Sequence, residues 1–311
     1  MTLPDHVHEL ARKVTNWGRW GDDDEVGTIN LITQDVVRRA AGCVRTGRTF
    51  SLALPLSEAE GVQTGAIPGR LNPTRTMVAI NTPLTGDPTD FCTSDDLVVM
   101  GLQAGTHWDG LGHVSYAGRM YNGFPVDSIG VSGAARCGIH RIRTLVSRGV
   151  LLDVARARGV DRLEGGYAIT AGDLDAAAEL ARVDVQPGDV VLVRTGQVQL
   201  LRPPRPDRRA YAAPAPGLSL GTVAWLRDHD VAAVATDNLT LEVFPGEDPA
   251  ALLPVHLLHI VEMGLTQGQN WQLEDLAADC AEDGVYEFLL DASPQPFTNA
   301  VGSPVNPVVV K

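Results

Sequence analysis

Cysteine is scarce in this 311-residue chain, and its four copies are scattered. Cys43, Cys92, Cys137 and Cys280 form no CxxC pair, which argues against a cysteine-based zinc site and fits a reducing compartment. None has a base nearby in sequence, so a thiol nucleophile is not expected. No apolar run approaches the ~20 residues of a membrane span, and residues 1–25 are polar, without a secretory signal. We therefore expect a cytoplasmic protein that does not enter a membrane.

Positive charge is also in short supply. The chain has 25 Lys and Arg against 38 Asp and Glu, a net charge of −13, and no basic cluster. Such a protein is a poor candidate for binding nucleic acid or an anionic membrane surface. Hydrophobic residues make up 44% of the chain, enough for a sizeable core. A small molecule is the expected partner.

Strand and helix signals alternate along the chain without a linker, which predicts one α/β domain over residues 1–311. Residues 1–48 form an N-terminal arm and a helix, and two tryptophans in this arm, Trp17 and Trp20, either pack on the body or close a pocket in a neighbouring subunit. Thr33 and Thr170 are the expected N-caps of two helices. Further strands and helices are predicted at 49–56, 149–154, 190–193, 231–235 and 285–292, and at 34–46, 171–182, 220–228 and 254–264.

The stretch Gly101–Tyr116, GLQAGTHWDGLGHVSY, concentrates the polar chemistry of the chain. It follows Asp96–Met100, an apolar run that predicts a buried strand. Gln103, His107, Asp109 and His113 are separated by even steps, so an extended segment would point all four side chains to one face. Nitrogen and carboxylate groups at this spacing are typical of a first-row metal site or an acid/base site.

Other residues have weaker signals. Trp108 lies between His107 and Asp109 and is expected to face the opposite side, in a supporting position. Asp237 and Glu242 follow a strand end, a usual place for site residues in α/β folds. Tyr116 belongs to a Gly-rich region, 115–133, that we expect to line a pocket together with the loop at 57–75.

These residues resemble the cyclase-like metal-dependent hydrolase family, which includes kynurenine formamidase and isatin hydrolase. The resemblance covers most of the chain. It begins with WGDDDEVGTINLIT at 20–33, centres on AGTHWDGLGHV at 104–114, and continues with PGDVVLVRTG at 187–196, ATDNLTLEV at 235–243 and the helix at 254–264. It implies a barrel-like mixed β-sheet surrounded by helices, in a protein that forms homodimers or homotetramers.

The resemblance also implies one or more divalent metal ions, zinc or manganese. The ligand positions correspond here to Gln103, His107 and Asp109, and a downstream acidic position corresponds to Gln269. Gln103 thus stands where a histidine is expected, and Gln269 where a glutamate is expected. Both changes weaken cation binding, because an amide oxygen replaces an imidazole nitrogen and a negative charge is lost. We expect at most one weakly held ion, manganese rather than zinc, or none.

The resemblance assigns proton transfer to His113 and places His256 at the position of a second site histidine. Three hypotheses follow. The first is hydrolysis of a small, possibly cyclic amide with one metal ion that activates water. The second is metal-independent acid/base catalysis of a cyclisation, dehydration or isomerisation, with Asp109 orienting His107. The third is a non-catalytic protein that binds a small molecule in the same pocket.

Overall fold

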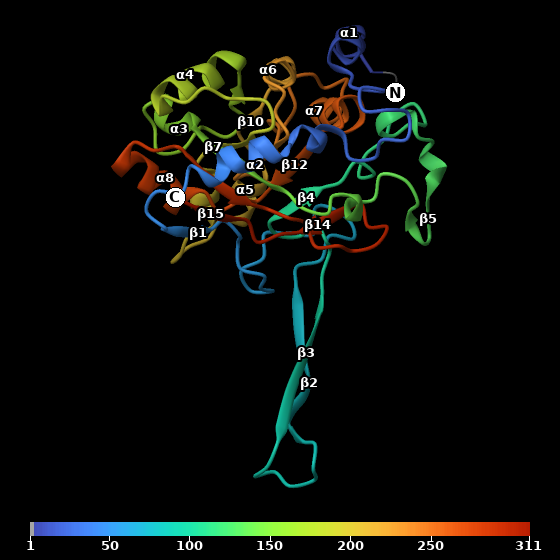
Figure 1. The fold of residues 1–311 in the computed structure, drawn as a ribbon, viewed down its shortest axis with the longest axis vertical. Helices are drawn as coiled ribbons and strands as arrows, with labels where there is room; N and C mark the ends of the chain where they lie inside the picture. The colour runs from blue at the N-terminus through green and yellow to red at the C-terminus, as the bar shows by residue number, and fades with distance from the viewer. Residues whose placement is uncertain (1–2) are drawn as a thin grey trace.

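The computed structural model describes residues 3–311 and shows one α/β domain built on a curled mixed sheet. The sheet closes half a barrel and helices flank it, which confirms the fold class predicted from the sequence (Figure 1). In spatial order its nine strands are β1 (Thr49–Ser51), β15 (Val308–Val310), β13 (Glu287–Asp291), β7 (Val146–Asp153), β9 (Val190–Arg194), β11 (Ala233–Thr236), β12 (Thr266–Gln269), β4 (His107–Asp109) and β14 (Gly302–Pro304).

Four neighbouring strands, β7, β9, β11 and β12, run parallel, and the flanking strands pair antiparallel. Parallel strands are buried on both faces, which explains their continuous apolar runs. On β7, Val150 and Leu152 enter one core cluster, whereas Leu151 enters the cluster on the opposite face.

Helices cover both faces of the sheet. Helices α1 (Asp5–Val14), α4 (Ala171–Ala181), α6 (Thr222–Asp228) and α7 (Pro254–His256) contribute to the first core cluster, and α8 (Glu274–Asp283) contributes to the second. The predicted caps are confirmed, because the Thr33 side chain accepts the Val36 N–H and Thr170 forms a capping box with Asp173. Among residues 3–311 no helix is long and apolar enough to cross a membrane. The other α-helices are α2 (Gln34–Ala41), α3 (Val154–Ala157) and α5 (Arg208–Ala212).

The helix predicted at 254–264 begins as α7 and continues as a π-helix, η6 (Leu257–Met263), which ends at Gly264 in the left-handed conformation. The N-terminal arm packs on this helix of its own chain: the Trp17 indole donates to the Val261 carbonyl at 2.6 Å and the Asn16 amide to the Met263 carbonyl at 2.8 Å. Of the two interpretations of the arm, the structure shows packing on the body.

Smaller elements complete the fold. Two short strand pairs lie outside the main sheet, β8 (Ala168–Ile169) with β10 (Gly217–Leu218) and β5 (Ile129–Gly130) with β6 (Gly133–Ala134). Short 3₁₀ helices are η1 (Gly27–Leu31), η2 (Tyr121–Gly123), η3 (Val126–Ser128), η4 (Ile139–Arg141) and η5 (Gln197–Leu201).

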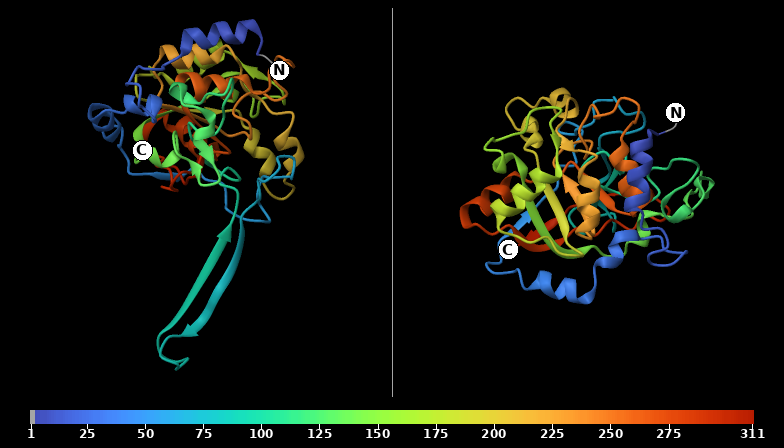
Figure 2. Two further views of the ribbon diagram at one scale, coloured as in Figure 1. Left: turned by 90° about the vertical axis from the view of Figure 1, so that its right-hand side faces the viewer. Right: turned by 90° about the horizontal axis from the view of Figure 1, so that it is seen from above.

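The remaining strands, β2 (Thr74–Pro83) and β3 (Cys92–Val99), form a long hairpin that projects from the body (Figures 1 and 2). The prediction of a buried strand at Asp96–Met100 was wrong. The segment is a strand up to Val99, but Leu97, Val98 and Val99 are exposed because the hairpin pairs only with itself. An apolar run predicts a strand, but it does not say whether that strand joins a covered sheet.

Candidate active site

Strand β4 carries the centre of the site. Its alternation points His107 and Asp109 to one face and Trp108 to the other, as predicted. The Trp108 ring is fully buried, packs edge to face on Trp271 at 4.8 Å between ring centroids, and donates from Nε1 to the Ala292 carbonyl at 2.7 Å. Trp108 therefore supports β4 from behind and does not line the site.

Strand β12 pairs antiparallel with β4 and supplies two amides to the same face. The register places Gln267 opposite Asp109 and Gln269 opposite His107. The Asp109 Oδ2 atom accepts hydrogen bonds from Gln269 Nε2 at 2.7 Å and from Gln267 Nε2 at 3.4 Å. These amides fix the orientation of a carboxylate that is only 1% exposed.

The other oxygen of Asp109 faces imidazole rings. Its Oδ1 lies 3.4 Å from His107 Nε2 and 3.5 Å from His113 Nε2. Burial alone would raise the pKa of Asp109, but His113, His107 and His256 together hold it well below its usual range. The site therefore keeps a buried carboxylate in its charged form.

His107 has a defined tautomer. Its Nδ1 donates to the Gly105 carbonyl at 2.8 Å, so in the neutral ring Nε2 carries a lone pair. That lone pair faces Asp109 Oδ1, and both atoms are buried without a hydrogen-bond partner. Two acceptors at 3.4 Å are stabilised only by a positive charge between them, either a proton or a metal ion.

His256 comes from helix α7 and is oriented by a glutamate. Glu242 Oε1 accepts from His256 Nδ1 at 2.5 Å and from the His256 backbone N–H at 2.9 Å, and Oε2 accepts from the Val255 N–H at 3.1 Å. With Nδ1 held by Glu242, His256 presents Nε2 to the site, 3.5 Å from Gln269 Nε2. A carboxylate that holds the far nitrogen of an imidazole is the arrangement of a general base.

His113 lies at the outer side of the cluster, with 19% of its side chain exposed. Its Nε2 lies 3.4 Å from Arg70 Nη2, so the guanidinium donates to the ring. Burial lowers the pKa of His113, Asp109 raises it in part, and Arg70 lowers it further. His113 and Arg70 thus form the more exposed edge of the cluster.

The four motif residues do not lie on one strand. Only His107 and Asp109 belong to β4, because Gln103 and His113 lie in turns on either side of it. The prediction of one extended segment was therefore wrong. Gln103 nevertheless reaches the site face: its amide packs against Gly302, which pairs with Asp109 on the neighbouring strand β14. Within residues 3–311 no hydrogen bond joins Gln103 to the site histidines.

Two other predicted site residues, Asp237 and Tyr116, make their hydrogen bonds outside the histidine cluster. Asp237 is fully buried and accepts from the Thr195 N–H, the Thr195 hydroxyl and the Gly196 N–H at 2.7–2.8 Å, which ties the ends of β9 and β11 together. Burial raises the pKa of Asp237 to about 6. Tyr116 donates its hydroxyl to Glu262 on η6. Neither side chain is hydrogen-bonded to the histidine cluster.

Sequence reasoning left three functional groups unassigned: Gln267, Arg70 and the orienting role of Glu242. Residues 266–269 read TQGQ, and in a strand Gln267 and Gln269 lie two apart and therefore share a face. This spacing was the signal that could have identified Gln267. Glu242 had a signal in its place after a strand end. Arg70 had none, since it reaches His113 from a loop.

The residues fit one weakly held divalent cation. His107 Nε2, Asp109 Oδ1 and Gln269 Oε1 are buried atoms without partners, and they offer an imidazole nitrogen, a carboxylate oxygen and an amide oxygen. The Gly105 carbonyl on His107 Nδ1 is the usual support of a metal-binding histidine. Across the described part of the chain, no group of three or more His, Cys, Asp or Glu side chains is arranged to hold a metal.

Comparison with known proteins places the chain in a family. A family model described as "Putative cyclase" matches residues 27–243, more than half of the chain, and the chain therefore belongs to this family. A solved structure described as a novel cyclase is 39% identical, with a TM-score of 0.87 over 96% of this chain and 100% of that chain. No curated protein matches.

More distant structures share the fold. Isatin hydrolase A from Labrenzia aggregata is 18% identical, with a TM-score of 0.62 over 89% of this chain and 97% of that one. A structure described as a potential metal-dependent hydrolase with cyclase activity is 17% identical, with a TM-score of 0.51 over 84% and 96%. At these identities the likeness shows the fold alone.

Proposed function

We propose that the protein hydrolyses the C–N bond of a small, possibly cyclic amide at the His107–Asp109–His256 cluster. The observation that carries this is the pair formed by Glu242 and His256, in which the carboxylate holds Nδ1 and leaves Nε2 directed at the site, beside a buried, charged Asp109. Family membership and the isatin hydrolase and metal-dependent hydrolase folds of its neighbours support an amide substrate.

In the proposed reaction, His256 Nε2 accepts a proton from the attacking water while Glu242 stabilises the imidazolium that forms. His107 and Asp109 lie at the base of the site, and Arg70 with His113 lies at its outer side. The guanidinium of Arg70 offers hydrogen bonds to the oxyanion that develops on the substrate carbonyl. The imidazolium of His256 then returns this proton to the leaving nitrogen, so that hydrolysis gives a carboxylate and an amine.

A divalent metal would be held by His107 Nε2 and Asp109 Oδ1, with the free Gln269 Oε1 as an additional oxygen. When bound, such an ion polarises a carbonyl and lowers the pKa of water. Two oxygens and one nitrogen suit manganese better than zinc. Gln269 thus replaces Gln103 as the amide ligand in this proposal.

The test is a panel of small amides and lactams, isatin included, with a gain of one water detected by mass spectrometry. We expect at least one compound to be hydrolysed, and His256→Gln to lower kcat by about 10²–10⁴-fold. His6→Asn, at an exposed histidine on α1, is the matched control and retains activity. A panel member that His256→Gln hydrolyses as fast as the parent would contradict the assigned base.

A second candidate is metal-independent acid/base chemistry on the same substrates or on a related cyclisation. It is favoured by the Glu242–His256 pair, which requires no metal. It is also favoured by the 3.4 Å distance between His107 Nε2 and Asp109 Oδ1, because a proton between these two atoms stabilises them without a metal ion. Elemental analysis of protein purified without chelator, followed by a chelator titration, separates the two. Full activity of metal-free protein eliminates the metal-assisted mechanism.

A cytoplasmic location is part of the same proposal. It is supported by four free cysteines, three of them buried, which fit a reducing compartment.

A further inference from the structure

The Gly105 carbonyl that orients His107 has a second partner. Besides His107 Nδ1 at 2.8 Å, it accepts a hydrogen bond from Asn270 Nδ2 at 2.9 Å, so both lone pairs of the oxygen are used. Gly105 precedes β4 and lies outside the pairing of that strand with its neighbours. Glycine also has the widest choice of backbone angles. The direction of this carbonyl is therefore fixed from outside β4, by Asn270.

Asn270 is itself held at each of its polar groups. Its backbone N–H donates to the Asn238 carbonyl at 2.9 Å, and its backbone carbonyl accepts the Thr106 hydroxyl at 2.5 Å. Its side-chain Oδ1 accepts the hydroxyl of Tyr211 on α5 at 2.6 Å. Because the Gly105 carbonyl can only accept, the NH₂ group must face it, which leaves Oδ1 for the hydroxyl. The amide of Asn270 therefore has a single orientation.

The backbone of Asn270 links two parts of the site. Strand β12 ends at Gln269, and Asn270 follows with a φ of 61°, in the left-handed region that asparagine adopts more readily than most residues with a side chain. The turn thus comes directly after the glutamine that donates to Asp109. Asn270 ends the strand that holds Asp109, and it holds the carbonyl that orients His107.

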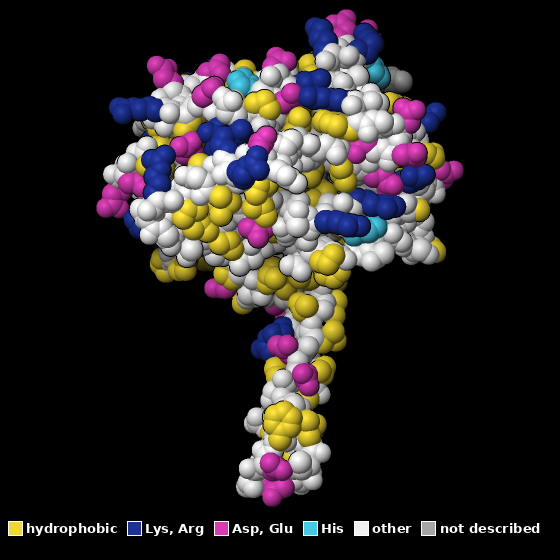
Figure 3. Space-filling view, in the orientation of Figure 1, with side chains coloured by type: hydrophobic (Ala, Val, Ile, Leu, Met, Phe, Trp, Pro, Cys, Tyr) yellow, Lys and Arg dark blue, Asp and Glu magenta, His cyan; other side chains and the backbone are white. Residues whose placement is uncertain are grey.

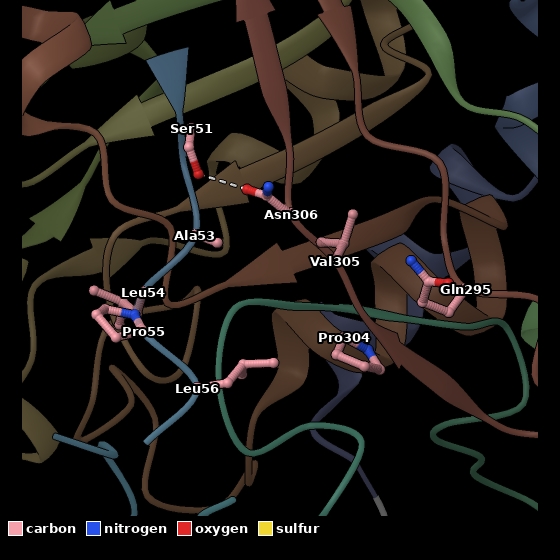
Figure 4. A pocket seen from close by; sticks show the side chains of 9 residues that line it. All are labelled: Ser51, Ala53, Leu54, Pro55, Leu56, Gln295, Pro304, Val305 and Asn306. Atoms are coloured by element: carbon pink, nitrogen blue, oxygen red, sulfur yellow. Dashed lines mark hydrogen bonds between the residues drawn. The ribbon is translucent and has the colours of Figure 1, made fainter. Parts of the chain in front are cut away.

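The network formed by Tyr211, Asn270 and Gly105 is internal. Tyr211 and Asn270 are 0% exposed and Gly105 is buried, in contrast with the apolar side chains that the projecting hairpin presents to solvent (Figure 3). Leu54 donates its N–H to the Thr106 hydroxyl at 2.8 Å and lines the hollow in Figure 4, whose lining includes none of the three network residues. A buried polar group that loses its partner is left unsatisfied. Burial also raises the pKa of Tyr211 well above its usual value, so its hydroxyl keeps the proton that it donates.

We propose that Asn270, held by Tyr211, is a positioning residue for His107, because it fixes the carbonyl that keeps the ring proton on Nδ1 and leaves Nε2 without one. In the other tautomer Nε2 carries the proton and donates directly to the charged Asp109 Oδ1, 3.4 Å away. That bond would occupy the nitrogen that a metal ion or a catalytic proton needs. The consequence for catalysis rests on the proposed function, whereas the choice of tautomer does not.

NMR of the ring nitrogens in protein labelled with ¹⁵N-histidine tests the proposal, because a ring nitrogen changes its chemical shift when it gains or loses a proton. Metal-free protein is measured at pH 9, above the usual range of a histidine pKa, and His107 is assigned by the signals lost in His107→Gln. We expect the parent to carry the proton on Nδ1 alone. Asn270→Gly tolerates the positive φ and removes the amide, so it should move the proton to Nε2 in part or in full. In the proposed reaction its kcat should fall at least about 10-fold with little change in KM.

Asn16→Gly is the matched control. Asn16 is 2% exposed, its Nδ2 donates to the Met263 carbonyl at 2.8 Å, and its Oδ1 accepts from Arg19 at 3.2 Å. The substitution therefore removes the same two kinds of hydrogen bond at a place that does not touch Gly105. It should lower the stability of the protein and leave the His107 signals where they are in the parent.

Tyr211→Phe is a milder second variant, since it removes one hydroxyl from the far side of the network. It should move the His107 proton in the same direction as Asn270→Gly, and it decides the question if Asn270→Gly does not fold. Parent-like His107 signals in either folded variant would overturn the proposal. The same change in Asn16→Gly, or a parent with the proton on Nε2, would also overturn it. Because the readout needs no substrate, a failure to hydrolyse any amide would count against the proposed function and leave this test intact.

Discussion

Glu242→Gln is the sharpest perturbation of the proposed base, because it keeps the shape of the side chain and removes only its charge. The carboxylate now accepts three hydrogen bonds, from His256 Nδ1 and from the backbone N–H groups of His256 and Val255. A glutamine has one acceptor oxygen and an NH₂ group. If the oxygen keeps the His256 bonds, the NH₂ group faces the Val255 N–H, and two donors meet in a buried place.

The size of the effect follows from these contacts. Loss of charge-assisted hydrogen bonds at a residue that is 1% exposed should lower the free energy of unfolding by about 2–3 kcal/mol. The effect on catalysis is separate. Without the carboxylate, His256 is a weaker base and its imidazolium is not stabilised, so kcat should fall by about 10²–10³-fold with little change in KM.

The assay is initial-rate kinetics on whichever amide the parent hydrolyses, together with urea unfolding of each variant. Glu274→Gln is the matched control: Glu274 is also buried and accepts charged hydrogen bonds from Arg194 at 2.7 and 3.1 Å, but it makes no contact with His256. It should lose similar stability and retain kcat. A kcat for Glu242→Gln within about threefold of the control would refute the assignment of His256 as the general base and of Glu242 as the carboxylate that orients it.

Three further predictions concern the surroundings of this pair. Burial lowers the pKa of His259 to about 3. Below about pH 6.5 the unfolded chain therefore binds a proton at this residue that the folded chain does not bind. The contribution of His259 to the free energy of unfolding is fully present above that pH and is lost as the pH falls toward 3. In urea unfolding at several pH values, His259→Asn should flatten this loss by up to about 1.4 kcal/mol per pH unit, and an unchanged slope would count against it. Gln269→Glu should destabilise metal-free protein by about 2–4 kcal/mol, because a hydrogen-bond donor to Asp109 becomes a second buried carboxylate. Added Mn²⁺ should restore the melting temperature of this variant. A variant that neither melts at a lower temperature than the parent nor responds to Mn²⁺ would contradict this prediction. Trp108→Ala should cost about 3–5 kcal/mol in urea unfolding by leaving a cavity behind β4, and a cost under about 1 kcal/mol would show that the ring does not support the strand.

Local pattern was enough to predict part of the site. The side chains of His107 and Asp109 share a face because residues two apart on any strand do so, and this holds for a strand of only three residues. Extending the same rule to Gln103 and His113 failed, because the chain turns at both ends of β4. Even spacing says nothing about where a strand stops, and the glycines at 110 and 112 mark turns as readily as they mark a bulged strand.

Long-range partners could not be predicted from pattern. Gln267 and Gln269 reach Asp109 through the pairing of β12 with β4, strands separated by more than 150 residues. Strand order of this kind is set by the packing of the whole domain. The parallel strands at the centre were predictable, because burial on both faces leaves continuous apolar runs. The exposed hairpin was not predictable, because an apolar run that stays exposed looks the same in the sequence as one covered by the core.

The gap between His107 Nε2 and Asp109 Oδ1 separates the two proposed chemistries by their response to Mn²⁺ at different pH values. A proton in this gap neutralises the single carboxylate and leaves no excess charge, whereas a dication leaves one positive charge in a buried site that already has Arg70 at its edge. Gln269 increases this imbalance, because it supplies an amide where a second carboxylate would have balanced the ion. A metal would therefore be held weakly. Since proton and metal compete for the same nitrogen, metal occupancy must rise with pH. Activity that rises with pH and with added Mn²⁺ supports the metal, and activity that is indifferent to Mn²⁺ at every pH supports the proton.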